Sequence, residues 1–424
     1  MSPRVARFVD YALVLLGIVI LFVVPHRISG DGVPRFETLE RLVNTGVLAS
    51  PRYSVLVPLF ASPLYFVGRA LRDPQGITAL FNVLLFTGSL FFLARELREE
   101  VSPRTRRACL LLLVYASMFP NHVQVFYGEV LTALTVTLGV FWIARGKPVR
   151  GWAVIIIGAV NTPAAIVGVG AIALRAAMRE KRWLHLAGPI VAFALARAES
   201  IIVHGSALST GYEGDAGYRT VLPYSGLPGF SYPFFLGVLA IVLSFGKGLV
   251  FFTPGLFVSV ASRSSSDRLR WIHGTLIAFV IGLVLVYARW WAWYGGSFWG
   301  PRFFLIASVP ACIALATRLE KPEEETLRVR IVLGSVLLLS FWVGANGLVF
   351  DQTGLDLCWK NDYANEALCH FVPEMSVLWH PFVDFGSAVP EKSRPLAIGV
   401  CALFLGVALW VGRDLWKSLF VRSP

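Results

Sequence analysis

Apolar runs long enough to cross a lipid bilayer recur along this chain, and they constrain its fold more than any other feature. A membrane-spanning helix needs about 20 mostly apolar residues, because the hydrocarbon core is about 30 Å thick. The sequence is 56% hydrophobic and only 15% charged, whereas a soluble domain is roughly a quarter charged. The runs leave no room for a large soluble domain. We therefore expect an all-α polytopic membrane protein, with residues 1–424 forming a single integral membrane domain.

The positions of the basic residues predict the topology. The formal net charge is +12, but Lys and Arg gather in short loops such as 95–107, 145–150 and 175–183. Such loops face the cytoplasm under the positive-inside rule, so the charge indicates topology and not nucleic-acid binding. Alternation of sides predicts about twelve transmembrane helices, within a range of 11–13, and places both termini in the cytoplasm of a bacterial-type plasma membrane. The first run lacks a cleavable signal pattern. The expected crossings are 6–25, 76–94, 108–121, 129–144, 151–161, 163–177, 184–203, 249–262, 272–290, 303–317, 331–347 and 395–412.

Three loops are expected on the outer side, at 26–75, 205–248 and 348–394. The first should carry a short amphipathic helix and then the proline-broken stretch 54–70, which parity makes juxtamembrane or re-entrant. The third contains Cys358 and Cys369. Oxidation is possible on that side, so we expect this pair to form a disulfide bond that closes a short loop.

Gly30, Asp31 and Gly32, followed by Arg35, lie at the start of the first outer loop. Flanking glycines let the backbone approach a ligand closely. A carboxylate in a partly dry pocket can take the proton of an attacking hydroxyl, which is the work of a general base. The alternative is a helix N-cap, because Pro34 follows at a first-turn position. Both interpretations of Asp31 stay open at this point.

Glu129 opens the apolar run 129–144, and His122 and Tyr127 precede it. The helix dipole favours a glutamate at a helix start, which would be a purely structural role. However, an acid at the head of a membrane helix commonly faces an aqueous cavity. We expect Glu129 to act in a site, with His122 and Tyr127 as substrate contacts.

Two cations begin later apolar segments on the expected outer side. Lys247 lies between two glycines, where helix N–H groups and an ammonium suit an anion; the alternative is a lysine that snorkels to the interface. Arg302 stands where positive charge is disfavoured on that side, and a guanidinium is a natural bidentate clamp for a phosphate. The Trp and Tyr residues at 290–294 are expected to form an interfacial belt.

Together these features resemble the C-type (GT-C) membrane glycosyltransferases, which include protein O-mannosyltransferases and the aminoarabinose transferases of lipid A. The resemblance rests on the acid after the first helix, on the juxtamembrane helices, and on the stretches YSVLVPLFASPLY (53–65), SFGKGLVFFTPGL (244–256) and WYGGSFWGPRFF (293–304). It implies a sugar donor carried on polyprenyl phosphate or pyrophosphate and used on the extracytoplasmic face. It also implies that Asp31 is the base of one inverting displacement and Glu129 a second acid. Donor-phosphate contacts would come from Lys247 and Arg302.

Arg35 and Tyr53 complete the expected substrate contacts. No cofactor is required, since two cations can serve the phosphate; a divalent metal stays open, but no metal ligand is assigned. The expected partners are the lipid-linked sugar donor, membrane lipid, and an acceptor glycan, lipid or protein, with no nucleic acid. Two alternatives come from other classes. One is a transporter or flippase of a lipid-linked or anionic solute, which usually shows internal repeats, and the other is a membrane scaffold without catalysis.

Overall fold

The computed structural model describes residues 2–48, 52–261, 265–350 and 355–420, and helices provide the regular structure of these ranges. The β structure within them consists of two isolated bridges, Arg27 with Val125 and Ala216 with Pro228. The α-helices are α1 (Pro3–Val23), α2 (Gly32–Thr45), α3 (Leu56–Ala70), α4 (Pro74–Ala79), α5 (Phe81–Glu96), α6 (Pro103–Tyr115), α7 (Phe119–His122), α8 (Glu129–Ala144), α9 (Pro148–Asn161), α10 (Ile166–Glu180), α11 (Ala187–His204), α12 (Phe234–Leu243), α13 (Leu249–Phe252), α14 (Asp267–Tyr287), α15 (Ser308–Arg318), α16 (Leu327–Val349), α17 (Glu366–Phe371), α18 (His380–Val383), α19 (Phe385–Ala388), α20 (Arg394–Val411) and α21 (Arg413–Phe420). The 3-10 helices are η1 (Leu97–Glu99), η2 (Pro163–Ala165), η3 (Trp183–Leu186), η4 (Pro254–Phe257), η6 (Arg302–Ala307), η7 (Pro322–Glu324), η9 (Asp356–Cys358), η10 (Pro373–Met375) and η11 (Glu391–Ser393).

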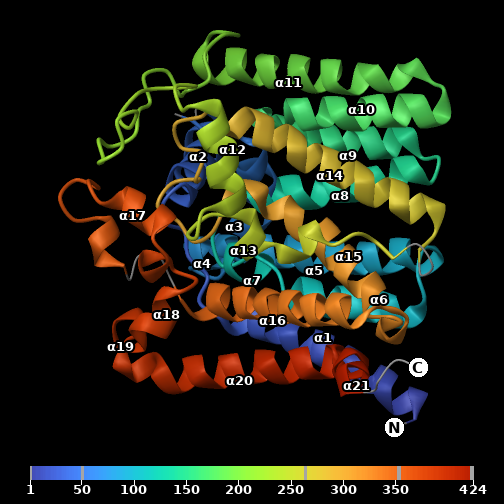
Figure 1. The fold of residues 1–424 in the computed structure, drawn as a ribbon. Helices are drawn as coiled ribbons and strands as arrows, with labels where there is room; N and C mark the ends of the chain where they lie inside the picture. The colour runs from blue at the N-terminus through green and yellow to red at the C-terminus, as the bar shows by residue number, and fades with distance from the viewer. Residues whose placement is uncertain (1, 49–51, 262–264, 351–354, 421–424) are drawn as a thin grey trace.

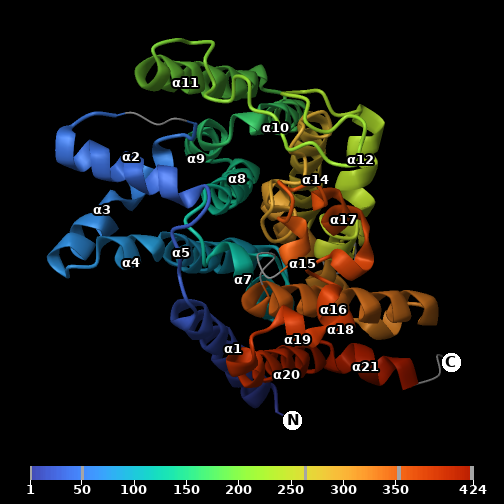
Figure 2. The same cartoon turned by 90° about the vertical axis from the view of Figure 1, so that its left-hand side faces the viewer.

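The long helices lie side by side and run in roughly the same direction across the bundle (Figure 1). In that view α11 lies along one edge and α20 along the opposite edge, with α14 and α16 between them. The start of α1 and the helix α21 lie at one end of the bundle. Residues 205–233 and the helices α17 to α19 lie at the other end, which we call the loop end (Figures 1 and 2).

Six helical segments of the described residues are long and apolar enough to cross a membrane, judged by length and composition. They are Pro3–Val23, Pro74–Glu99, Trp183–His204, Asp267–Tyr287, Leu327–Val349 and Glu391–Val411. Four shorter apolar helices, α3, α8, α9 and α12, accompany them. The chain is therefore an integral membrane protein, while the expected total of about twelve crossings stays a prediction.

Some expected crossings differ from the structure. In the run 108–121, α6 ends at Tyr115 and only the short α7 follows, and the run 303–317 begins as the 3-10 helix η6 before α15. The run 249–262 differs most. Only Leu249–Phe252 is α-helical there, and the 3-10 helix η4 follows. Pro254 lacks a backbone N–H, so it cannot continue the hydrogen bonding of α13. Residue 262 itself lies outside the described ranges. Conversely, residues 205–248, expected as a loop throughout, include the apolar helix α12.

The first connecting segment, 26–75, carries the helices α2 and α3 and the start of α4. Its residues 49–51 lie outside the described ranges. The helix α3 contains Pro63 inside its span and is shorter than the six long helices. A separate apolar core, which includes Phe36, Leu39, Tyr65 and Phe126, joins α2 and α3 to α5 and to the turn before α8. The segment is therefore packed as a folded element at the side of the bundle.

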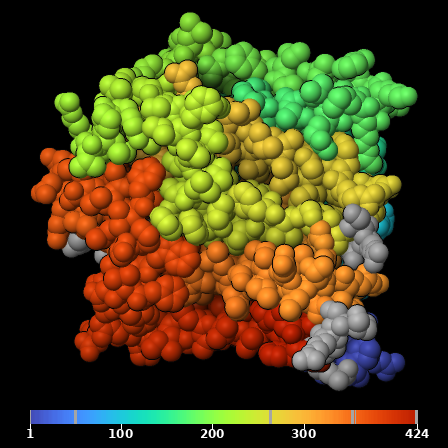
Figure 3. Space-filling view, viewed as in Figure 1, coloured from blue at the N-terminus to red at the C-terminus, as the bar shows by residue number. Residues whose placement is uncertain are grey.

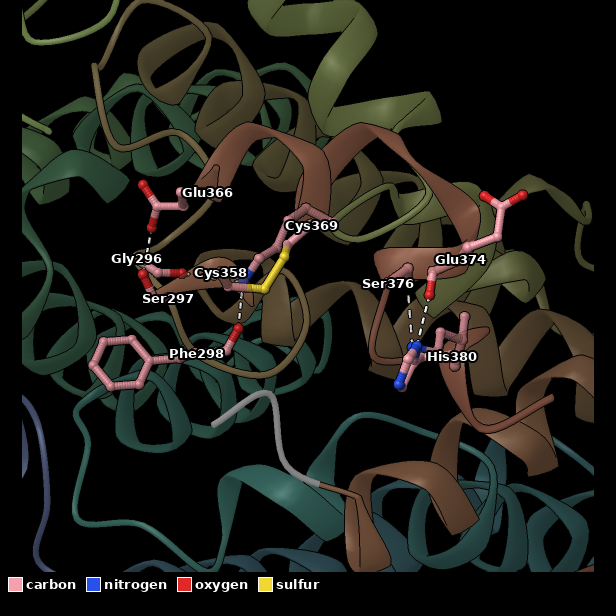
Figure 4. The surroundings of a disulfide bond; sticks show 11 residues. Gly296, Ser297, Phe298, Cys358, Glu366, Cys369, Glu374, Ser376 and His380 are labelled. Atoms are coloured by element: carbon pink, nitrogen blue, oxygen red, sulfur yellow. Dashed lines mark hydrogen bonds between the residues drawn. A yellow bond between two sulfur atoms is a disulfide. The ribbon is translucent and has the colours of Figure 1, made fainter. Parts of the chain in front are cut away.

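The segment 355–372 packs against the residues that precede α13. Cys358 and Cys369 form the disulfide bond expected from the sequence (Figure 4), while residues 351–354 of the expected loop lie outside the described ranges. The space-filling view shows the parts of the chain near 205–250 and 355–395 meeting along one face (Figure 3). The rings of Tyr218 and Tyr363 stack there, with centroids 4.0 Å apart. The two long connections thus form one layer over the loop end.

Candidate functional site

A cavity of about 690 Å³ lies at the loop end of the bundle. Its polar wall contains expected site residues from three parts of the chain: Asp31, Arg35 and Tyr53 of the segment 26–75, Glu129 at the start of α8, and Arg302 at the start of η6. Its other wall is largely apolar and comes from α8, α9, α11 and α14, with side chains such as Ala133, Val160, Ala192, Ala196, Phe279 and Leu283. The cavity therefore offers a charged end and an apolar end to a ligand.

The apolar end of this cavity reaches the outer surface of the bundle at α11. Phe193 lines the cavity and is also 56% exposed. Its neighbours Ile190 and Val191 are exposed as well, and the segment Trp183–His204 is one of the six long apolar spans. An exposed apolar helix face of this kind suits contact with lipid. A ligand with a hydrocarbon chain could therefore occupy this wall.

Asp31 lies at the polar end of the cavity and pairs with Arg302. The Asp31 Oδ2 atom is 2.6 Å from Arg302 Nη2, and the side chain of Tyr53 also hydrogen-bonds to the carboxylate. Asp31 occupies the N-cap position of α2, but its side chain makes no capping hydrogen bond. Of the two interpretations that the sequence left open, the geometry therefore favours a carboxylate directed into the cavity.

Two features of the backbone bring Asp31 to this place. The N–H of Arg27 donates to the carbonyl of Gln124 at 2.8 Å, which joins the end of the first segment to the turn before α8. Gly30 adopts a φ of +51°, and a Cβ atom there would lie 2.6 Å from the Phe298 ring. Only glycine accepts both the left-handed backbone and the close approach. The glycine before Asp31 thus lets the loop pack onto residue 298.

Arg302 is the central cation of the polar wall. Its Nη1 atom is 3.5 Å from Glu129 Oε1, so one guanidinium bridges both expected acids. Its Nε–H donates to the carbonyl of Gly295, and its guanidinium carbon lies 4.5 Å from the centre of the Phe298 ring. Nη1 and the Glu129 Oε2 atom are buried without a hydrogen-bond partner. Arg302 Nη1 can therefore still donate a hydrogen bond, and Glu129 Oε2 can still accept one, beside the cavity.

The electrostatic balance keeps Asp31 ionised near neutral pH. Burial by itself raises the pKa of the Asp31 carboxyl, but Arg302, Tyr53 and Arg35 together hold that pKa below its usual value. Burial and the nearby Asp31 charge raise the pKa of the Tyr53 hydroxyl, so it stays protonated and can donate to the carboxylate. A carboxylate so strongly paired becomes a better proton acceptor once a ligand draws the guanidinium away.

Arg35 provides a second cation at the cavity. It is buried, and its Nε and Nη1 atoms have no hydrogen-bond partner. The guanidinium lies over the Tyr53 ring, 4.5 Å from the centroid, in a cation–π contact. Burying a guanidinium with unsatisfied N–H groups is costly. Arg35 is thus well placed to donate to an anionic ligand.

Residues without any site signal in the sequence cover the cavity near Tyr53. Arg52 pairs with Asp215 at 3.0 Å, and Tyr212 packs edge-on against Tyr53. Glu199 accepts hydrogen bonds from the Val55 N–H at 2.7 Å and from the Ser54 hydroxyl. These contacts tie the connection before α3 to α11 and to the 205–233 connection. No local sequence pattern predicts these contacts, because the two partners of each contact lie far apart in the sequence.

The structure differs from the expectation for Lys247. The side chain is 1% exposed and does not line the cavity. Its ammonium donates to the carbonyl oxygens of Gly296, Phe298 and Gly300. An ammonium has three N–H donors, so these three acceptors use all of them. Lys247 therefore supports the backbone of residues 295–300 and has no donor left for a phosphate.

His122 and Tyr127 lie close to the cluster but outside the cavity wall. The ring of Tyr127 is 5.3 Å from the guanidinium carbon of Arg302. His122 is buried and packs edge-on against Trp299, with ring centroids 5.9 Å apart. Both therefore pack around the residues that carry Arg302. Within the four described ranges, no group of three or more His, Cys, Asp or Glu side chains is placed to hold a metal ion.

Comparison with known proteins adds one structural likeness. The sequence matches no family model and no curated protein. Among solved structures, the chain is similar to the apo-state crystal structure of ArnT from Cupriavidus metallidurans, with a TM-score of 0.47 and 13% sequence identity. The match covers 97% of this chain and 77% of that chain. A likeness of this strength carries no activity from one protein to the other.

Proposed function

We propose that this protein is a membrane glycosyltransferase. It moves a sugar from a polyprenyl-phosphate or polyprenyl-pyrophosphate donor to a hydroxyl acceptor on the extracytoplasmic face, with inversion at the anomeric carbon. One observation carries the proposal: Asp31, Glu129 and Arg302, distant in sequence, meet at the charged end of a cavity whose other wall is apolar membrane helix.

The two-ended cavity supports a lipid-linked donor. The exposed apolar surface around Phe193 lets a polyprenyl chain approach from the bilayer, and the apolar wall covers its first isoprene units. The phosphate then lies at the polar end, where Arg302 and Arg35 can donate to it. A volume of about 690 Å³ falls in the range of about 300–1,000 Å³ that is usual for ligand pockets.

Asp31 is the proposed general base. When the donor phosphate binds, it competes with Asp31 for the guanidinium of Arg302, and the freed carboxylate becomes more basic. The acceptor oxygen attacks the anomeric carbon while its proton passes to Asp31. The bond between that carbon and the phosphate oxygen breaks in the same step. Attack from the face opposite the leaving group inverts the anomeric carbon, and a correctly placed base contributes about 10²–10⁴ in rate.

The leaving phosphate gathers negative charge as that bond breaks. In the proposal, Arg302 and Arg35 stabilise this charge, because pre-placed cations in a dry site cost little reorganisation at the moment of reaction. Glu129 keeps Arg302 in the cavity while Asp31 is taking the proton. The proposal therefore assigns the phosphate contact to Arg35 in the place where Lys247 was expected.

A transfer assay tests the function directly. The purified protein would be incubated with a panel of labelled polyprenyl-phosphate sugars and a membrane extract that supplies acceptors. We expect one donor to release free polyprenyl phosphate and to leave its label on an acceptor with inverted anomeric configuration. Folded protein that releases no sugar from any donor of the panel would overturn the proposal. Movement of the intact lipid across vesicles without sugar release would indicate a flippase instead.

A further inference from the structure

Two buried charged residues, Lys247 and Glu366, hydrogen-bond to residues 295–300 without lining the cavity. This stretch, here called the 295–300 loop, immediately precedes Arg302. Gly295, Gly296 and Gly300 all have positive φ, between 61° and 78°. Such backbone turns are open mainly to glycine, and the loop presents three carbonyl oxygens to one point. The Lys247 ammonium occupies that point.

Glu366 holds the same loop through its carboxylate. Its carboxylate accepts hydrogen bonds from the Tyr294 hydroxyl at 2.9 Å and from the Ser297 hydroxyl, and Figure 4 shows the bond to Ser297. Burial raises the pKa of Glu366, while the two hydroxyl donors and the nearby charge of Lys247 oppose that rise. A buried carboxylate that keeps such specific partners acts mainly on the position of those partners.

The helix that carries Glu366 is itself fastened in two ways. The disulfide bond joins Cys369 of α17 to Cys358. The N–H of Gly246 donates to the carbonyl of His370 at 2.9 Å. A Cβ atom at position 246 would lie 2.0 Å from the Cys369 carbonyl oxygen, so this contact requires glycine. The residue next to Lys247 therefore lies directly against α17.

The 295–300 loop determines the orientation of the Arg302 side chain. The Nε–H of Arg302 donates to the Gly295 carbonyl, which directs Nη2 toward Asp31 and Nη1 toward Glu129. A shift of the loop would turn the guanidinium away from both acids. Misplacement of a binding group by about 1 Å can cost about 100-fold in rate.

We infer that Lys247 and Glu366 are positioning residues, which aim Arg302 at the donor phosphate through the 295–300 loop. The disulfide bond between Cys358 and Cys369 extends this support to the outer segment 355–372. Donor affinity therefore depends on a segment that never touches the donor. This inference rests on the proposed function, because it explains how Arg302 is held in position for the phosphate contact that the proposed function assigns to it.

Three variants test whether these residues position Arg302 through the 295–300 loop. They are Glu366→Gln, Lys247→Met and the double variant Cys358→Ser with Cys369→Ser. Each should raise the KM for the polyprenyl-phosphate donor by about 10-fold to 100-fold. The acceptor KM should rise much less than the donor KM, because the acceptor meets Asp31, whose carboxylate Tyr53 also holds by a hydrogen bond. Loss of folded protein alone would lower the rate and leave both KM values unchanged. The control is Glu374→Gln, an exposed acid that points away from Glu366 (Figure 4) and should leave both KM values unaltered.

A double-mutant cycle separates positioning from direct contact. If Lys247 acts through Arg302, adding Lys247→Met to Arg302→Ala should raise the donor KM no further, because the two residues then form one unit. If Lys247 itself touches the phosphate, the two effects should multiply, and the inference is overturned. Should the Lys247 variant not fold, the same cycle with Glu366→Gln replaces it.

The failure of this inference differs from failure of the proposed function. Wild-type protein that binds and uses the donor, together with Glu366 and disulfide variants of unchanged donor KM, refutes only the positioning role. Wild-type protein that neither binds polyprenyl phosphate nor releases sugar from the donors refutes both. Fluorescence of the many Trp residues on titration with polyprenyl phosphate measures this binding without turnover.

Discussion

Replacing Asp31 with Asn removes the proposed base while keeping the shape of the side chain. Loss of a positioned general base costs about 10²–10⁴ in rate, which corresponds to about 3–5 kcal/mol in the activation barrier. The structure suggests a modest effect on folding, since Arg302 retains Glu129 at 3.5 Å and the Gly295 carbonyl. Loss of one charged hydrogen bond is worth about 1.5–3 kcal/mol. We therefore expect a folded protein with almost no turnover.

The measurement is the initial rate of sugar transfer by purified protein at several donor concentrations. The kcat of the Asp31→Asn variant should fall by at least about 100-fold, whereas the donor KM should stay constant or decrease, because the phosphate no longer competes with a carboxylate for Arg302. Thermal melting in detergent should verify that the variant is folded. The matched control is Glu37→Gln, which neutralises an exposed acid on the same helix, α2, and should keep full activity.

Two results would refute this reasoning. An Asp31→Asn variant with more than about a tenth of the wild-type kcat would show that another group takes the proton, because base catalysis contributes at least about 10². A large increase in donor KM at unchanged kcat would show that Asp31 binds the donor and has no part in the proton transfer. Glu129→Gln, tested beside it, should lower activity less, since its proposed role is to hold Arg302.

Three further expectations follow from the same geometry. Arg302→Lys removes the planar guanidinium that reaches both acids, and it should raise the donor KM by about 10-fold to 100-fold, the equivalent of one or more charged hydrogen bonds; an unchanged donor KM would exclude the phosphate contact. Ala196→Trp fills the apolar wall of the cavity, so transfer from a long polyprenyl donor should fall while transfer from a short-chain analogue persists, and equal losses for both would argue against a lipid groove. Burial raises the pKa of Asp31, but Arg302, Tyr53 and Arg35 lower it overall below 3.8. The ion pair therefore stabilises the fold fully when the pH is above the pKa of Asp31 in the unfolded chain. This stabilisation is lost as the pH falls through the lower pKa of Asp31 in the folded protein. Melting temperatures measured below about pH 4 should therefore decrease more steeply for the wild type than for Asp31→Asn, and parallel curves would contradict the pairing.

The sequence alone determined the membrane character of the chain and the approximate limits of most helices. These properties depend on hydrophobicity and run length, which are local. The expected run 129–144 coincides with α8, and the expected runs 6–25 and 395–412 differ from α1 and α20 by a few residues. The run 249–262 failed because its composition is apolar but Pro254 stops the helix. Composition over a window is insensitive to one residue that cannot donate a hydrogen bond.

Only the tertiary structure decided which polar residues share one site. Asp31 and Arg302 each had a plausible local role, and their separation of 2.6 Å follows from helix packing that no local pattern encodes. Lys247 illustrates the opposite case, because a glycine-flanked lysine suits an anion or a ring of carbonyls equally well in sequence. The carbonyls that occupy it belong to a loop about 50 residues further along the chain. Glu366 gave no signal at all, since its partners are two hydroxyls brought to it by the fold. Hydrophobicity acts residue by residue, whereas the pairing of charges depends on where the packed helices bring their ends together.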